Sequence, residues 1–176
     1  MKKIIVLLLL SFSFLLISCN RDEVDVVRIS LRQGVDTVEI HTEHVDAGAR
    51  ARALNQNLDV IVVSNNVDIT TLGTYQIVYQ TTYDNKTYQM IRIVHVVDQT
   101  PPTLTLNEGV DTIFIGQSWV DAGVIVTDNS LEQLSYTVTG TVNAMVAGTY
   151  EIIYETTDSS GNTGRVTRYV HVISPE

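Results

Sequence analysis

Apolar and polar positions alternate along many segments of the chain, and this period of two predicts β-strands. In the stretch YEIIYE (150–155), tyrosine and isoleucine alternate with glutamate, and only Ile153 breaks the pattern. The stretch YQIVYQ (75–80) has the same form. Val, Ile, Thr and Tyr dominate, and no stretch of helical length beyond the N-terminal segment shows a 3.6-residue period. We therefore expect an all-β protein.

The chain contains an internal repeat with a period of 75 residues, which shifts to 76 where His95 matches His171. Self-similarity at a fixed period predicts two copies of one structural unit. The segment DQTPP (98–102) separates the copies, and its proline pair predicts a short, stiff linker. The matched segments are GVDT (34–37 and 109–112), VDAG (45–48 and 120–123) and GTY (73–75 and 148–150).

The N-terminus has the features of an export signal. Lys2 and Lys3 precede an apolar run over residues 4–17, and a polar stretch follows at 20–23. This order is typical of a secretory signal peptide. A transmembrane helix needs about 20 apolar residues, and this run is shorter.

The sequence LISC (16–19) resembles the bacterial lipobox. The resemblance implies that Cys19 receives a diacylglyceryl group and, after cleavage, becomes the first residue of the mature chain. Two or more acyl chains, palmitate among them, hold a protein stably on a membrane. The alternative is that Cys19, which is the only cysteine, is simply part of the signal. The expected location is extracytoplasmic, anchored to the cell membrane by the N-terminal lipid.

The two GTY segments resemble the start of strand F in immunoglobulin domains. There, a tyrosine lies two residues before the second core cysteine, and its hydroxyl bonds back to the backbone. Tyr75 and Tyr150 occupy that tyrosine position, and Ile77 and Ile152 stand where the cysteine would be. We expect an aliphatic pair to replace the disulfide in each core.

The pattern resembles the bacterial Ig-like domain family named after the Ig-like region of a pesticidal crystal protein. The resemblance implies tandem domains of a surface protein, without implying a ligand. The first copy departs from it, with Ala53-Leu54 in place of Asp128-Asn129 and a shorter late turn at 84–86. The second copy carries nearly all of the pattern: Gly116, Trp119, Asp121, Gly123, Asp128-Asn129, Gly148-Thr149-Tyr150, Asp158, Gly161-Asn162, Arg168, Val170 and Val172.

The predicted fold class is therefore all-β, with two tandem Ig-like β-sandwich domains after an N-terminal lipoprotein signal peptide. The expected parts are a signal peptide at 1–18, a lipidated cysteine and spacer at 19–26, Ig-like domain 1 at 27–98, a linker at 99–102 and Ig-like domain 2 at 103–174.

Composition narrows the function. The net charge of −9 and the small number of Lys and Arg residues predict no basic stripe, so we expect no nucleic-acid partner. No Gly-rich phosphate loop, nucleophile elbow or second cysteine is present. We therefore expect a protein that is not an enzyme and has no catalytic residues.

Two sets of residues are candidates for ligand binding. A carbohydrate-binding role is favoured if Trp119, Tyr136 or Tyr169 is exposed beside the acidic turns, although a lone tryptophan more often packs over the core. The spacing of His41 and His44 on a strand does not suit a shared metal. Carboxylate and amide oxygens would bind calcium if they met at one end of the second sandwich, and the same side chains also form turns. These calcium candidates are Asp121, Asp128, Asn129 and Asp158; no other cofactor is expected.

We expect a cell-surface lipoprotein whose tandem domains act as a structural spacer or protein-interaction module. The alternative is a carbohydrate-binding or adhesive surface module. Its expected partners are the membrane, through the lipid anchor, and a surface protein or glycan.

Overall fold

The computed structural model describes residues 27–175, and the predicted signal peptide and Cys19 lie outside this range. The described part of the chain is all-β, which confirms the predicted fold class. It contains no helix long and apolar enough to cross a membrane. The strands are β1 (Val27–Leu31), β2 (Thr37–Glu39), β3 (Ala49–Ala53), β4 (Gln56–Leu58), β5 (Ile61–Asn65), β6 (Gly73–Tyr83), β7 (Lys86–Val97), β8 (Thr103–Leu106), β9 (Thr112–Phe114), β10 (Val124–Thr127), β11 (Thr137–Thr139), β12 (Gly148–Thr157) and β13 (Thr163–Ile173).

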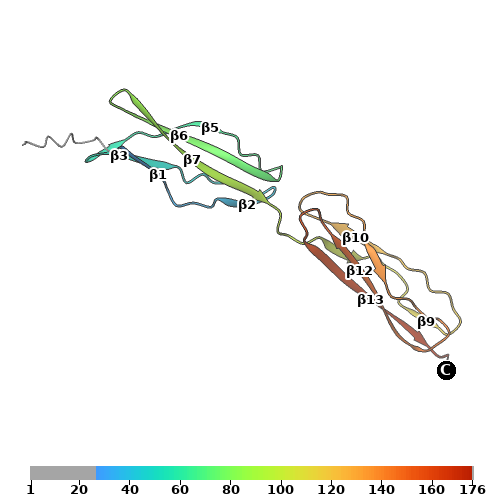
Figure 1. Ribbon diagram of the computed structural model, residues 1–176. Coiled ribbons are helices and arrows are strands. Elements are labelled where there is room, and N and C mark those ends of the chain that lie inside the picture. The colour runs from blue at the N-terminus through green and yellow to red at the C-terminus, as the bar shows by residue number, and fades with distance from the viewer. Residues whose placement is uncertain (1–26, 176) are drawn as a thin grey trace, which may run out of the picture.

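The strands form two sandwiches that follow one another along the chain (Figure 1). In the first sandwich, the sheet β1-β3-β4 faces the sheet β2-β7-β6-β5. In the second, the pair β10-β8 faces the sheet β11-β12-β13-β9. Each sandwich also contains one parallel pairing, β2 with β7 and β9 with β13. The sequence repeat is therefore a repeat of the fold.

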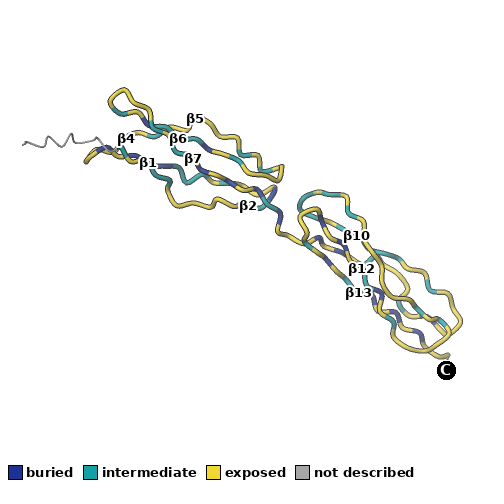
Figure 2. The backbone as a smooth tube through the Cα atoms, viewed as in Figure 1, coloured by how far each residue is buried: buried dark blue, intermediate teal, exposed yellow. Residues whose placement is uncertain are grey.

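The alternating pattern places one face of each long strand in the core. Ile152 and Tyr154 on β12 are buried, and their counterparts Ile77 and Tyr79 on β6 are buried in the first sandwich. The buried residues lie along the paired strands of each sandwich (Figure 2). The prediction that isoleucines occupy the positions of the core cysteines is confirmed.

The GTY segments form the predicted tyrosine corner in both sandwiches. The Tyr75 hydroxyl donates a hydrogen bond to the carbonyl oxygen of Thr71 at 2.7 Å. The Tyr150 hydroxyl donates to the carbonyl oxygen of Val146 at 2.8 Å. Each bond ties the first residues of a long strand to the loop before it, as in immunoglobulin folds.

A buried arginine explains why the VDAG segment occurs twice. Arg168 is 2% exposed; it forms a salt bridge of 2.6 Å with Asp111 and donates to the carbonyl oxygen of Asn107 at 2.6 Å. The Tyr154 hydroxyl beside it donates to Asp121, the aspartate of VDAG. Buried charges are retained only when they are paired and hydrogen-bonded, so the arginine and its partners have to occur together.

The first sandwich has an equivalent network, except that Arg92 Nε donates to the Tyr79 hydroxyl at 3.2 Å and Arg168 Nε has no hydrogen-bond partner. Arg92 is 1% exposed, pairs with Asp36 and donates to the carbonyl oxygen of Arg32 at 2.6 Å. The Tyr79 hydroxyl donates to Asp46, the aspartate of the first VDAG segment. The repeated GVDT and VDAG segments therefore supply the partners of one buried arginine per sandwich.

The late turn differs between the two copies. In the first sandwich, Asp84 and Asn85 both have positive φ angles, 47° and 57°, and form a two-residue turn between β6 and β7. Such turns match the twist of the hairpin that they close. In the second sandwich, β12 ends at Thr157, and a longer loop from Asp158 to Asn162 leads into β13. This longer loop lies at the end of the second sandwich that meets the linker.

Candidate functional site

Three aspartates converge at the junction between the sandwiches. Asp98 directly follows β7, Asp128 directly follows β10, and Asp158 directly follows β12. One carboxylate oxygen from each lies within 4.8 Å of those of the other two. Within residues 27–175, this is the only group of three or more His, Cys, Asp or Glu side chains close enough to share a metal ion.

The same aspartates shape the local turns: Asp98 and Asp128 do so through Oδ1 alone, and Asp158 through both oxygens, which accept from Asn162 at 2.8 Å each. Asp98 Oδ1 accepts a hydrogen bond from the backbone N–H of Thr100 at 3.1 Å. Asp128 Oδ1 accepts from the N–H of Ser130 at 2.8 Å. These short-range bonds are the usual way in which aspartate stabilises a turn, and they hold the carboxylates in fixed directions.

Three oxygens at this junction have no hydrogen-bond partner. They are Asp98 Oδ2, Asp128 Oδ2 and the amide oxygen of Asn129, and all three are buried. Asp98 as a whole is only 7% exposed. Buried polar atoms are nearly always paired, so three orphan acceptors in one place require a physical explanation.

Glu39 connects the first sandwich to this cluster. It is the last residue of β2, and its Oε1 accepts from the N–H of Gln99 at 2.9 Å and from the hydroxyl of Thr100 at 2.8 Å. The same oxygen accepts from Asn129 Nδ2 at 3.0 Å, which directly links the two sandwiches. Asn162 Nδ2 adds a bond of 3.2 Å to the carbonyl oxygen of Asp98.

The electrostatics of the cluster are unbalanced. Burial raises the pKa of Asp98 above its ordinary value, and the neighbouring carboxylates raise it further. Burial would also raise the pKa of Glu39, but the hydrogen bonds that this residue accepts outweigh burial and lower it. None of the salt bridges within residues 27–175 brings a Lys or Arg to these acidic side chains. A positive charge at their centre would relieve the repulsion.

The predicted calcium residues are only partly brought together. Asp128, Asn129 and Asp158 do lie at one end of the second sandwich, as expected. Asp121 does not join them; instead it accepts the bonds of Tyr154 and of the Gly123 N–H, the latter at 2.9 Å. Asp121 belongs to the arginine network because the Tyr154 hydroxyl that bonds it lies beside Arg168.

Sequence reasoning missed Asp98 and Glu39. The available signal was the position of Asp98 next to the proline linker, where a side chain can reach loops of the following sandwich. The histidine segment offers no rival site: His41 is exposed in a turn after β2 with a φ of 60°, and the described residues contain no metal-binding group that includes His41 or His44.

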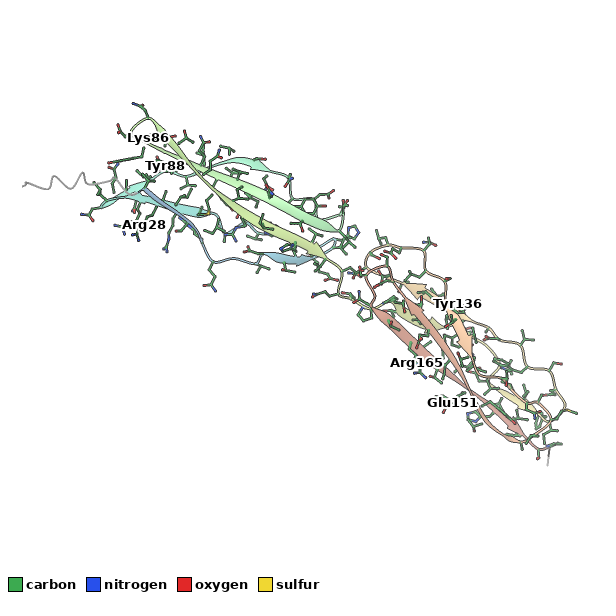
Figure 3. All side chains as sticks on the ribbon, in the orientation of Figure 1. Arg28, Lys86, Tyr88, Tyr136, Glu151 and Arg165 are labelled. Atoms are coloured by element: carbon green, nitrogen blue, oxygen red, sulfur yellow. The ribbon has the colours of Figure 1, made fainter. Side chains whose placement is uncertain are left out.

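The aromatic candidates do not form one platform. Trp119 is half-buried, packs against the core of the second sandwich and donates from its ring nitrogen to the carbonyl oxygen of Val110 at 3.0 Å. Tyr136 lies on the second sandwich (Figure 3). Its ring packs edge-on against the buried ring of Tyr154, with ring centroids 5.9 Å apart. Tyr169 is 51% exposed and alternates with buried residues of β13, so it points away from that core.

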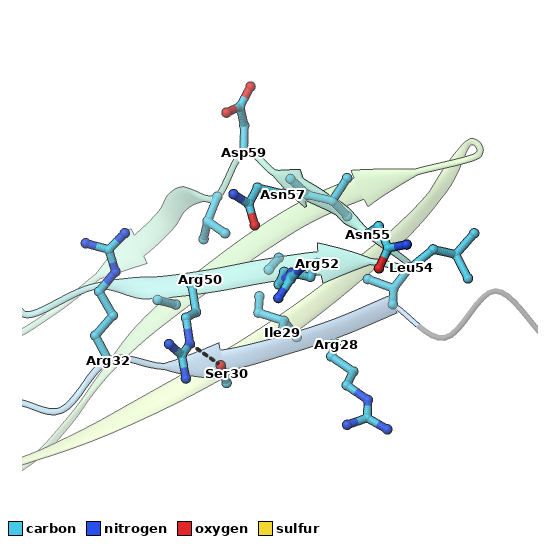
Figure 4. A pocket seen from close by; sticks show the side chains of 15 residues that line it. Arg28, Ile29, Ser30, Arg32, Arg50, Arg52, Leu54, Asn55, Asn57 and Asp59 are labelled. Atoms are coloured by element: carbon cyan, nitrogen blue, oxygen red, sulfur yellow. Dashed lines mark hydrogen bonds between the residues drawn. The ribbon is translucent and has the colours of Figure 1, made fainter.

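The first sandwich carries a basic face, which the small number of Lys and Arg residues did not predict; the expectation of no nucleic-acid partner stays a prediction. Arg28 on β1 lies directly opposite Arg52 on β3, and Arg50 bonds the hydroxyl of Ser30 at 3.3 Å (Figure 4). Arg32 lines the same open hollow, and all four arginines are exposed. Period-two spacing in RISLR and RAR was the available signal. Guanidinium groups on one face can bind phosphate or carboxylate groups.

Comparisons with known proteins found similarity to a phage protein, a solved structure and a bacterial domain family. The chain is 34% identical over 125 residues to an uncharacterized 81.3 kDa protein of Acholeplasma phage L2; the match covers 65% of this chain and only 17% of the phage protein. A structure of Clostridium perfringens ZmpB, which contains an M60 catalytic domain and two CBM51 domains, aligns with 85% of this chain at 13% identity and a TM-score of 0.40, and 31% of that chain is covered. Residues 104–172 match the family described as bacterial surface protein, Ig-like domain. The second sandwich is therefore similar to this family, which confirms the predicted resemblance to bacterial Ig-like domains.

Proposed function

We propose that the protein is a lipoprotein of the bacterial cell surface whose two Ig-like sandwiches act as a spacer or protein-interaction module. The observation that carries the spacer role is the junction. A linker of four residues joins the sandwiches, and Glu39 of the first sandwich bonds both the linker and Asn129 of the second. A short linker with such bonds holds two domains in series, which suits a protein that keeps a partner at a distance from the membrane.

The anchor is tested by substituting Cys19. In cells given labelled palmitate, the wild-type chain should incorporate the label and sediment with membranes, whereas Cys19→Ser should do neither. The matched control is Ser18→Ala, which keeps a small residue before the cysteine and should remain labelled. Incorporation of label into the Cys19→Ser chain would refute the anchor.

The second candidate function is a carbohydrate-binding or adhesive module, and the basic face of the first sandwich favours it. Arg28 and Arg52 face each other across two strands, an arrangement of like charges that destabilises a sheet unless an anion lies between them. Acidic polysaccharides supply carboxylate groups at regular intervals, which guanidinium groups bind in a bidentate manner.

A glycan array that contains neutral and acidic glycans tests this candidate. Binding restricted to acidic glycans, lost in the Arg28→Gln/Arg52→Gln double variant and kept in Arg165→Gln, would support it. Arg165 is an exposed arginine of the second sandwich and controls for the loss of charge alone. A blank array would leave the spacer and protein-interaction role in place.

A further inference from the structure

We propose that the junction between the two sandwiches is a calcium site, with Asp98, Asp128 and Asp158 as carboxylate ligands and the amide oxygen of Asn129 as a further ligand. The ion would join the linker to two loops of the second sandwich. Neither the lipid anchor nor the spacer role is needed for this inference, because binding is a property of the purified chain.

The first argument is the distance between the donor atoms. Calcium–oxygen distances are about 2.3–2.6 Å, so two oxygens on opposite sides of one ion are about 4.6–5.2 Å apart. The three carboxylate oxygens lie within 4.8 Å of one another and therefore fit around a single ion. The donors are hard oxygen atoms, and such atoms prefer calcium to zinc or copper.

The second argument, independent of the clustering of acidic residues, is the set of orphan acceptors. Asp98 is more than nine-tenths buried, and its Oδ2 has no hydrogen-bond partner. Asp128 Oδ2 and Asn129 Oδ1 are in the same condition. In each of these side chains, the other polar atom is already used: Thr100 and Ser130 bond the two Oδ1 atoms, and Glu39 bonds the amide nitrogen. The turns therefore orient Asp98, Asp128 and Asn129 and leave one oxygen of each free for a ligand. Asp158 would bind the ion through a second lone pair of an oxygen that also accepts from Asn162.

The third argument is that three of the four donors, Asp98, Asp128 and Asn129, occur only once in the repeat. The positions in the first sandwich that correspond to Asp128 and Asn129 hold Ala53 and Leu54, and Asp98 corresponds to Ser174 at the end of the chain. The framework residues, by contrast, occur in both copies. A set of acidic side chains that appears only where two sandwiches meet belongs to the junction and is not needed for the fold.

Glu39 is a positioning residue in this site. Its Oε1 accepts the bond from Asn129 Nδ2 at 3.0 Å, which turns the amide so that Oδ1 is free. Because Glu39 lies on the first sandwich, calcium bound at Asn129 would strengthen the link between the sandwiches. Calcium should therefore restrict the angle between them.

Binding is tested by equilibrium dialysis of radioactive calcium against the purified full chain in detergent. The expected result is one saturable site with a Kd of about 10⁻⁴–10⁻³ M, the range of extracellular calcium modules. Asp98→Asn and Asp128→Asn should each weaken binding at least tenfold, and Asp59→Asn, an exposed aspartate on the first sandwich, should not. No saturable uptake at 10 mM calcium, or equal uptake by Asp98→Asn, would overturn the proposal. Equal competition by magnesium would overturn the assignment to calcium.

A stability measurement separates a metal ligand from a residue that the fold merely needs. At a free calcium concentration about 100 times Kd, the unfolding equilibrium constant of the wild-type chain should fall about 100-fold, and that of Asp98→Asn should not change. In EDTA, Asp98→Asn should be at least as stable as the wild type, because asparagine keeps the oxygen that Thr100 bonds and removes a buried charge. Lower stability of this variant in EDTA would instead assign Asp98 a structural role and overturn the proposal.

The effect on geometry is tested by spin labels at Gln89→Cys and Arg165→Cys in a Cys19→Ser chain. Both positions are exposed and lie on the long strands β7 and β13. Calcium should narrow the distance distribution between the labels, and Asp98→Asn should abolish the narrowing. A distribution that calcium leaves unchanged would refute the predicted restriction of the angle.

Discussion

Replacement of Arg168 by methionine should destabilise the second sandwich by about 3 kcal/mol. The guanidinium forms a salt bridge of 2.6 Å with Asp111 and donates to the carbonyl oxygen of Asn107 at 2.6 Å. Removing one partner of a buried ion pair costs about 3–5 kcal/mol. Because the Asp111 side chain is 43% exposed, water can solvate its carboxylate in the variant, so the loss lies at the lower end of that range. Methionine fills most of the arginine volume and keeps the cavity contribution small.

Fluorescence of Trp119 makes this prediction specific to one sandwich. It is the only tryptophan of the chain and packs against the core of the second sandwich. For a small domain with an m-value of about 1 kcal/mol/M in urea, the fluorescence midpoint should fall by about 3 M. Arg92→Met is the matched control, because Arg92 has the same partners in the first sandwich. It should leave the Trp119 transition unchanged and lower only the transition of the first sandwich, measured by circular dichroism. An unchanged Trp119 midpoint in Arg168→Met would refute the role of the network.

Two further predictions concern the same core. Ile152→Ala should destabilise the second sandwich by about 2–5 kcal/mol, since Ile152 is only 2% exposed; calorimetry would show this, and an unchanged melting temperature would contradict its core position. Burial and the hydrogen bond to Asp121 raise the pKa of Tyr154 from 10.0 to about 12. In the unfolded chain, the Tyr154 hydroxyl ionises near pH 10. The stability that its raised pKa gives the folded chain is therefore complete below pH 10, and about 2–3 kcal/mol of it is lost as the pH rises to about 12. Between pH 10 and 12, the free energy of unfolding measured by Trp119 fluorescence should fall less in Tyr154→Phe than in the wild type. An equal fall in both would disprove the link between Tyr154 ionisation and stability.

The strands and tyrosine corners could be predicted because their signals are local. Alternation in YEIIYE identifies the buried face of β12, and the position of Tyr150 relative to Ile152 identifies the corner. The burial of Arg168 could not be predicted in this way. Arginine is among the residues that are least often fully buried, and its partners Asp111 and Asn107 lie 57 and 61 residues away in the sequence. Only the assembled sandwich brings them together.

The acidic cluster at the junction also could not be fully predicted from the sequence. Asp128 and Asp158 were identified because they lie in turns of one copy, but turn residues give no information about which loops meet in space. The omission of Asp98 has a clear cause: it lies before the linker, outside the second copy, and reaches the cluster only because β7 ends at the junction. Asp121 was grouped with them on residue type alone, although its place in a repeated segment already indicated a role that both sandwiches share.

Repetition in this chain therefore separates residues that build a sandwich from residues that join the two. Each sandwich has one buried arginine, Arg92 or Arg168. The aspartate and tyrosine partners occur in both copies because each buried guanidinium has to be neutralised. The acidic group around Asp98 occurs once because the described chain has one junction. At the corresponding end of the first sandwich, Leu54 is 57% exposed, and a two-residue turn replaces the long loop. That end cannot hold a cation in the same way, so a change in calcium concentration should act on the junction and leave the fold of each sandwich unchanged.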